Sequence, residues 1–190
     1  IPMCGVPFRA ADAYIAKLIE NGRKVAVCEQ VEDASVAKGL VRREVVRVIT
    51  PGMILNETLL DKTSNNFLLA LSNVKDDAGL AYLDISTGSF RTCQAAKTGR
   101  PFPLTLIDEA LKLDPKEVLL PSNFEDDPIY KPVRQAFAGR QITYVPKMEF
   151  NLEDARERLA KKFKTRSLEG FGIENMAASI SAAGAVLSYV

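Results

Sequence analysis

The sequence predicts an α/β protein made of two units, and three observations support this prediction. Residues 10–50 have the pattern of one helix followed by two strands. A Pro-Gly break and a polar stretch at residues 56–66 then interrupt the chain. Beyond the break, three short strands precede an alternation of helices and strands. We therefore expect a partial α+β domain at residues 1–60 and a second α/β domain at residues 61–190.

The first unit begins with a helix at residues 10–21. A period of three to four residues places one set of side chains on its inward face: Ala11, Tyr14, Ile15, Leu18 and Ile19. Asn21 and Gly22 are predicted to end the helix because both tolerate the left-handed conformation of a helix C-terminus. β-Branched residues then indicate strands at residues 24–31 and 43–50.

The second unit has a more specific order of elements. Three strands joined by short turns predict an antiparallel meander at residues 66–72, 80–86 and 89–94, with a loop at 73–79. Helices and strands then alternate along the chain. They are a helix around residues 104–111, a strand at 117–120, a helix opened by Asp127-Pro128, a strand at 141–145, a helix capped by Asn151 and a helix at 177–190. Up to the helix capped by Asn151, this order, β-β-β-α-β-α-β-α, is that of the ribonuclease H-like fold with a mixed five-stranded sheet.

Two helices of this unit carry a defined apolar face. The helix after Asp127-Pro128 is expected to turn Ile129, Val133 and Phe137 inward, with an irregular start caused by Pro132. The helix after Asn151 is expected to bury Leu152, Ala155, Leu159 and Phe163.

Composition excludes several classes of chemistry. The chain is 47% hydrophobic with a net charge of +1, and it contains no histidine, so Ser-His-Asp, Cys-His and HExxH sites are excluded. It has no phosphate-binding glycine loop and no run long enough for a membrane span. Three scattered cysteines without a CxxC pair suggest reduced thiols in a cytoplasmic protein, with no metal site.

The ribonuclease H-like order raises the alternative of a metal-dependent nuclease. Such an enzyme needs several carboxylates that converge on two metal ions. Asp84 is the only acidic residue within the predicted meander strands, and Glu117 merely begins the next strand. We therefore interpret Asp84 as a turn or strand-end residue and expect no catalytic residues.

Two basic clusters are candidates for phosphate contacts. Lys38, Arg42, Arg43 and Arg47 lie in and before the second strand, where strand spacing puts Arg43 and Arg47 on one face. A charged edge strand that resists aggregation has the same pattern, so both interpretations stay open. The second cluster ends a helix, where positive charge stabilises the helix dipole: Lys161, Lys162, Lys164 and Arg166.

Long stretches of the chain resemble one family. The run IPMCGVPFRAADAYIAKLIENGRKVAVCEQVEDASVAKGLVRREVVRVITPGMILNETLL resembles the C-terminal part of the mismatch-binding domain of the bacterial MutS family of DNA mismatch-repair proteins. The stretches GLAYLDISTGSF, PKEVLLP, LEGFGIENM and SAAGAVLSYV resemble the connector domain that follows it. The chain also stops within an apolar helical pattern, so we expect a piece of a longer protein.

The resemblance implies a homodimeric clamp that binds mismatched or unpaired DNA bases and has MutL as its partner. It implies an ATPase, using ATP and magnesium, in a C-terminal part outside this segment, and a connector that presents a surface to MutL. The family reads mismatches with a Phe-x-Glu wedge. None of the nine phenylalanines here is followed by glutamate two positions later, so we expect the wedge upstream and no cofactor, catalysis or mismatch discrimination in this segment.

For this segment, the resemblance implies DNA-backbone contacts by Arg9, Arg42, Arg43 and Arg47, while roles in stabilising the fold stay open. A domain cut before its first strands would expose an apolar face, so we expect residues 1–60 to pack against a neighbouring chain or to be poorly ordered. A stand-alone DNA-binding protein is a third alternative, and a steep dependence of affinity on salt would distinguish it.

Overall fold

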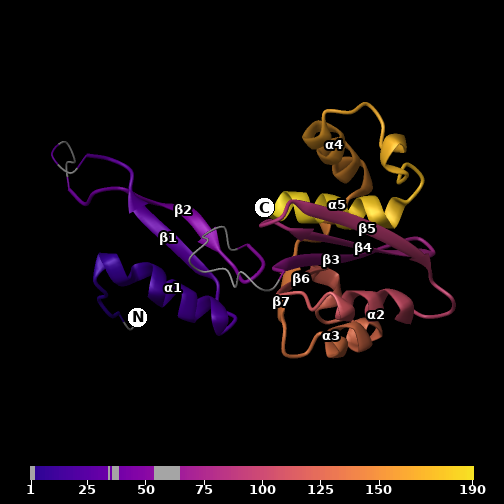
Figure 1. Ribbon diagram of the computed structural model, residues 1–190, viewed down its shortest axis with the longest axis horizontal. Helices are drawn as coiled ribbons and strands as arrows, with labels where there is room; N and C mark the ends of the chain where they lie inside the picture. Colours follow the sequence, from indigo (N-terminus) through magenta and orange to yellow (C-terminus); the bar gives the residue numbers. More distant parts are fainter. Residues whose placement is uncertain (1–2, 34, 36–38, 54–64) are drawn as a thin grey trace.

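The described residues form two separate sheets, one beside a single α-helix and one covered by helices on both faces (Figure 1). The computed structural model describes residues 3–33, 35, 39–53 and 65–190. A two-stranded sheet lies in the first part and a five-stranded sheet in the second. The predicted boundary at residues 60/61 lies outside the described residues.

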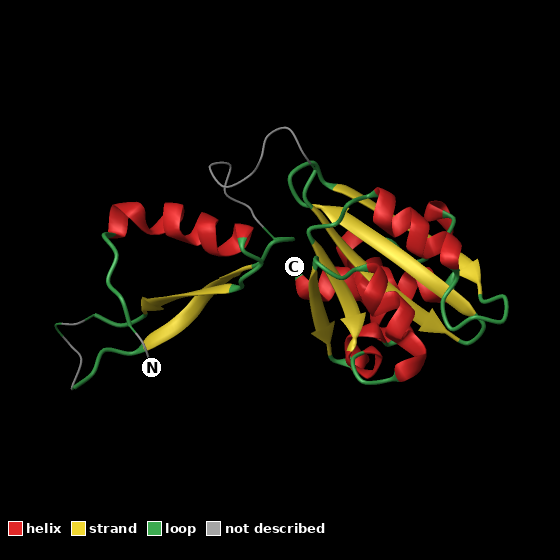
Figure 2. Ribbon diagram, turned by 90° about the horizontal axis from the view of Figure 1, so that it is seen from below, coloured by secondary structure: helices red, strands yellow, loops and turns green. Residues whose placement is uncertain are grey.

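The first unit consists of α1 (Ala11–Glu20), β1 (Val25–Gln30) and β2 (Arg43–Ile49). The two strands pair antiparallel, as Figure 2 shows beside the helix, and the predicted helix-strand-strand order is confirmed. Gly22, with φ of +69°, lies in the turn that ends α1.

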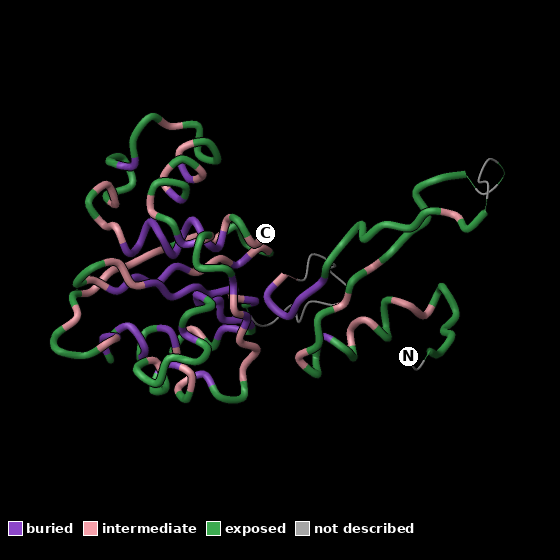
Figure 3. The backbone as a smooth tube through the Cα atoms, turned by 180° about the vertical axis from the view of Figure 1, so that it is seen from behind, coloured by how far each residue is buried: buried purple, intermediate pink, exposed green. Residues whose placement is uncertain are grey.

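This first unit buries little of its apolar surface. Ile19 of α1 and Ile49 of β2 are buried, but Tyr14 and Leu18 are 48% and 46% exposed although we predicted them inward. Two strands are too narrow to cover a whole helix face, which explains the error. Val45, Val46 and Val48 are also exposed, so the predicted apolar face is present, whereas its packing against another chain stays a prediction. Figure 3 shows the resulting contrast with the second unit.

The second unit contains β3 (Phe67–Val74), β4 (Asp77–Asp84), β5 (Ser89–Ala96), β6 (Glu117–Pro121) and β7 (Gln141–Val145). Their order in the sheet is β5-β4-β3-β6-β7, with antiparallel pairing among the first three and parallel pairing of β3, β6 and β7. The predicted mixed five-stranded sheet is therefore confirmed.

The prediction of a loop at residues 73–79 is wrong. Val74 pairs with Asp77, so β3 and β4 continue to a tight turn at Lys75 and Asp76, where Lys75 has a left-handed φ of +51°. The polar residues that suggested a loop lie instead at the end of a paired hairpin, because backbone pairing there outweighs their low strand propensity.

Helices cover both faces of this sheet. On one face α2 (Leu104–Lys112) and α3 (Lys131–Ala136) pack against Leu69 and Leu71 of β3. On the other face α5 (Ala177–Tyr189) packs against β3 and β4, and α4 (Leu152–Phe163) packs on α5, so that both helices share one apolar core with Leu68 and Ala70. The central strand β3 is therefore apolar on both sides, as a strand buried between two helical layers requires.

Two residues predicted to be buried are exposed. Ile129 is 52% exposed because it lies in a short 3-10 helix, Pro128–Tyr130, and α3 begins only after it, as the position of Pro132 suggested. Phe163, the last residue of α4, is 40% exposed. The predicted cap is confirmed, since the Asn151 side chain accepts hydrogen bonds from the backbone N–H groups of Glu153 and Asp154.

Within the described ranges, we find no helix with the length and apolar character that crossing a membrane demands.

Close helix packing leads to a first prediction. A Cβ added at Gly184 of α5 would overlap Ala155 of α4, whereas one added at Gly170 would meet no atom within 4 Å. Overpacking of this kind typically costs about 1–3 kcal/mol. We expect Gly184→Ala to lower the free energy of unfolding in urea by that order and Gly170→Ala to leave it nearly unchanged. An unaltered urea midpoint for Gly184→Ala would contradict the packing of α4 against α5.

Candidate nucleic-acid interface and the polar joint behind it

All four arginines predicted to contact DNA belong to the first unit and are exposed. Arg9 lies in a short 3-10 helix, Phe8–Ala10, before α1, and Arg42, Arg43 and Arg47 lie in or directly before β2. Arg42 is held by acidic neighbours, because its guanidinium pairs with Glu44 and its backbone N–H donates to the Glu32 carboxylate at 2.6 Å. Part of its charge is therefore already compensated.

A β-bulge separates two of these arginines. Arg47 pairs with Val27 of β1 and Arg43 pairs with Gln30, but the register shifts by one residue at Val46. Residues that pair across strands share a face, and positions three apart on β1 lie on opposite faces. The prediction that Arg43 and Arg47 share a face is therefore wrong, because the bulge inserts one residue between them. Strand spacing in the sequence gives no sign of this extra residue.

The second basic cluster lies at the C-terminal end of a helix, as predicted. Lys161 and Lys162 lie in the last turn of α4, and Lys164 takes a left-handed conformation at the C-cap. Lys38 lies outside the described residues.

Asp84 forms a turn. It is buried at the end of β4, and its carboxylate accepts hydrogen bonds from the Ser86 N–H at 3.0 Å and the Ser86 hydroxyl at 2.6 Å. In the described part of the chain no three Asp, Glu, Cys or His side chains gather where a metal ion could bind. Asp84 therefore has a local structural role in the turn that follows β4.

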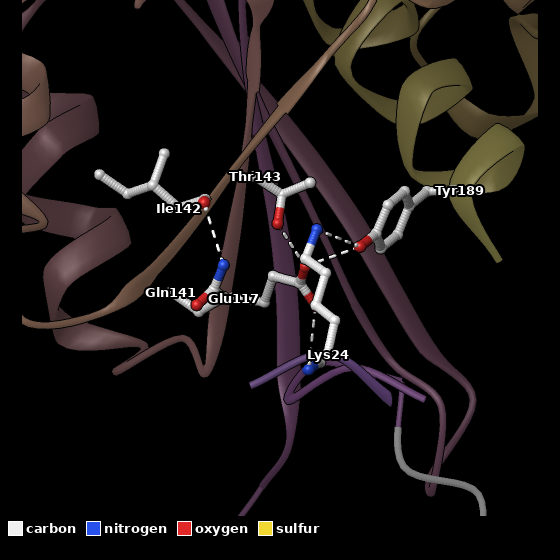
Figure 4. Close-up of polar contacts among 7 residues, drawn as sticks. Lys24, Glu117, Gln141, Ile142, Thr143 and Tyr189 are labelled. Atoms are coloured by element: carbon white, nitrogen blue, oxygen red, sulfur yellow. Dashed lines mark hydrogen bonds and ion pairs between the residues drawn. The ribbon is translucent and has the colours of Figure 1, made fainter. Parts of the chain in front are cut away.

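The most unusual side chain is one that the sequence did not identify as important. Glu117, the first residue of β6, is fully buried. Its Oε1 accepts hydrogen bonds from the Thr143 hydroxyl of β7 at 2.5 Å and from the Tyr189 hydroxyl of α5 at 2.7 Å (Figure 4). Its Oε2 accepts one from the backbone N–H of Gly52 at 3.2 Å, so four segments meet at one carboxylate.

Lys24 supplies the positive charge for this carboxylate. It directly precedes β1, and its Nζ lies 3.7 Å from Glu117 Oε1 (Figure 4). The same ammonium donates to the Tyr189 hydroxyl at 3.2 Å and lies 5.6 Å from the centre of the Tyr189 ring. Lys24 belongs to the first unit, and Gly52 lies in the turn through which the chain leaves it. The negative charge of Glu117 in the second unit is therefore balanced by a residue of the first unit.

The Thr50-Pro51-Gly52 turn after β2 is seated against the second sheet. All three of its residues are buried, and a Cβ on Gly52 would lie 2.9 Å from Glu117 Cβ and 3.0 Å from Leu68 Cδ1. Glycine is therefore required here for close approach rather than for flexibility. A sequence signal for the site does exist: Glu117 is a lone charge in an apolar strand, and such a charge requires partners when it is buried.

Burial also affects the titration of Tyr189. Burial, and secondly the negative charge of Glu117, raise the pKa of Tyr189 well above its ordinary value of 10.0. The hydroxyl therefore stays protonated and donates to Glu117 throughout the physiological range.

Comparisons with known proteins cover the whole chain. Models of MutS domain I and MutS domain II match residues 1–58 and 66–190. The chain is 63% identical over 190 residues to the DNA mismatch repair protein MutS of Desulforapulum autotrophicum and 48% identical over 190 residues to that of Desulfosudis oleivorans. It is 41% identical over 191 residues to that of Symbiobacterium thermophilum. Each match covers 100% of this chain but 21% of the relative, so the chain spans about a fifth of these curated relatives.

The raised pKa of Tyr189 predicts a loss of stability in alkali. The unfolded chain releases this proton first, so the free energy of unfolding should fall as pH rises above the ordinary tyrosine pKa of 10.0. We expect Tyr189→Phe to reduce this slope in urea titrations at increasing pH. It will not abolish the slope, because burial also raises the pKa of Tyr144. Tyr14→Phe, a change at an exposed residue of α1, is the control, and equal slopes for Tyr189→Phe and the unaltered chain would contradict the prediction.

Proposed function

This chain belongs to the MutS family of DNA mismatch-repair proteins, as a segment of domains I and II, and we propose that it couples DNA binding to the rest of the protein. The observation that carries the proposal is the joint at Glu117, which connects the arginine-bearing hairpin directly to the sheet of the second unit. A segment that transmits a DNA-bound state requires such a physical link between its two parts.

We assign residues 1–60 to the end of the mismatch-binding domain and residues 61–190 to the connector. For the connector we propose a ribonuclease H-like fold. The sheet order β5-β4-β3-β6-β7, with β4 antiparallel to β3 and parallel crossovers to β6 and β7, supports this proposal. A nuclease activity finds no support, since the family is one of mismatch repair and Asp84 has a structural role.

In the whole protein we propose the activities that the family resemblance implies. These are binding of mismatched DNA by a cytoplasmic homodimer, contact with MutL through the connector, and ATP hydrolysis with magnesium in a part beyond this segment. The segment itself is assigned no catalytic residue and no cofactor. Its proposed role is to hold the DNA-binding hairpin in place and to transmit changes in the position of the hairpin to the connector.

Arg9, Arg42, Arg43 and Arg47 are proposed to contact the DNA backbone from the hairpin side. Their exposure supports this role, and their different positions on the hairpin suggest that they do not contribute equally to DNA binding. Because Arg43 and Arg47 lie on opposite faces of the hairpin, we expect one of them to contact phosphates more strongly than the other. Arg42 is expected to contribute least, since Glu44 already compensates its charge.

The test is the salt dependence of DNA binding by a whole MutS protein that contains this chain. Loss of one phosphate contact lowers the slope of log affinity against log salt by about 1. We expect this for Arg43→Ala or Arg47→Ala and a smaller change for Arg42→Ala, measured by fluorescence anisotropy with a mismatched duplex.

The charge-matched control is Lys112→Ala, which removes a positive charge that pairs with Glu109 on α2 of the other unit. Its slope should equal that of the unaltered protein. Unchanged slopes for Arg42→Ala, Arg43→Ala and Arg47→Ala would exclude the hairpin from the DNA interface.

A further inference from the structure

We propose that Glu117 is a positioning residue that fixes the orientation of the first unit on the five-stranded sheet. Its partners are Lys24, Gly52, Thr143 and Tyr189, and we call these five residues the Glu117 cluster. The inference goes beyond the proposed function, because it assigns the joint to particular side chains and holds whether or not the hairpin binds DNA.

The argument begins with the cost of burial. An ionised carboxylate taken out of water is strongly destabilising unless it is paired and hydrogen-bonded. Within the second unit, Thr143 and Tyr189 provide hydrogen bonds to Glu117 but no charge. Lys24 is the one cation paired with Glu117 among the described residues, and it comes from the first unit. The second unit alone therefore leaves this carboxylate without a counter-charge.

The first unit completes the cluster from both ends of its hairpin. Lys24 directly precedes β1, and Gly52 lies in the turn that directly follows β2. Two contacts at separate points of the hairpin resist rotation as well as separation, because turning about one contact breaks the other. A single flexible linker would permit both motions.

Packing around the Glu117 cluster holds the Thr50-Pro51-Gly52 turn in one position against the second unit. Ile49 and Thr50 are buried, and the half-buried Met53 packs against the core between the sheet and α5. The fit at Gly52 leaves no room for a Cβ beside Glu117 and Leu68. The Glu117 carboxylate is therefore enclosed by packed side chains, whereas its partner Lys24 remains partly exposed to solvent.

The cluster also connects the hairpin to elements that extend across the second unit. Glu117 begins β6, which pairs directly with the central strand β3. Tyr189 ends α5, the helix that packs across β3, β4 and β5. A displacement of the hairpin therefore acts on both a central strand and a helix that spans the sheet. In some proteins a buried polar or ionic group specifies one arrangement rather than adding net stability, and we assign this use to the Glu117 cluster.

The experiment measures the distance between the two units by pulsed electron spin resonance on the full chain. One spin label is attached to the exposed Cys28 of β1 and the other to a cysteine placed at the exposed Lys112 of α2. Cys4 and Cys93 are replaced by serine and alanine, so that only the two chosen sites are labelled. We expect a single narrow distance peak.

Two variants break the cluster. Glu117→Ala removes the carboxylate, and Lys24→Met removes the ammonium group, with its hydrogen bond to Tyr189, while retaining an apolar stem. Lys24 is 38% exposed, so the second variant should fold even if the first does not. We expect loss of the narrow peak and a broad distribution in both, with the greater width for Glu117→Ala.

The matched control is Asp84→Asn, which neutralises another buried carboxylate of the same sheet, two strands from Glu117 and not among its hydrogen-bonding partners. It should retain the narrow peak. A narrow peak in Lys24→Met, or a broad distribution of equal width in Asp84→Asn, would overturn the proposal. The measurement contains neither DNA nor MutL, so its outcome is independent of the salt-dependence test of DNA binding.

Discussion

A charge can remain in a protein interior only if other groups replace the water that it has lost. In this chain that constraint applies at Glu117, and the groups that satisfy it come from four separate segments. The carboxylate therefore determines more than its own surroundings. It requires the end of α5, the middle of β7 and both ends of the first hairpin to meet at one place, so the arrangement of the two units follows from a local electrostatic demand.

The two units differ in how they are stabilised. The five-stranded sheet has a central strand with apolar residues on both faces, and two helical layers exclude water from it. Among its described residues the first unit has two strands and one α-helix, and several of its large apolar residues are exposed. A two-stranded sheet is marginally stable by itself. The packing of the Thr50-Pro51-Gly52 turn against the second unit therefore stabilises the fold of the first unit as well as its orientation.

The hairpin presents its arginines on two faces rather than one. The bulge at Val46 reverses the alternation of β2, so that Arg43 shares a face with Cys28 and Val45 while Arg47 shares one with Val27. Basic residues on two faces do not form the continuous row that phosphate tracking along one groove requires. This arrangement favours separate contacts, each with its own partner, over a uniform basic surface.

The sequence by itself determined the order of the elements, the helix caps and the family. Periodicity, turn residues and long matching stretches are local properties, and local propensity decides them: Asn151 caps its helix, and the strand at residues 117–120 forms as expected. It also indicated that Asp84 belongs to a turn, where its carboxylate accepts hydrogen bonds from Ser86. Even the irregular start of α3 followed from one proline.

Only the tertiary structure decided which side chains meet. The bulge in β2 is a property of pairing between two strands, and no pattern within either strand reveals it. The exposure of Tyr14 and Phe163 depends on how much surface the neighbouring elements cover. Glu117 and Lys24 lie far apart in sequence, and neither has a local motif. Their pairing follows from long-range packing, because the buried charge is satisfied by partners that only the folded chain brings together.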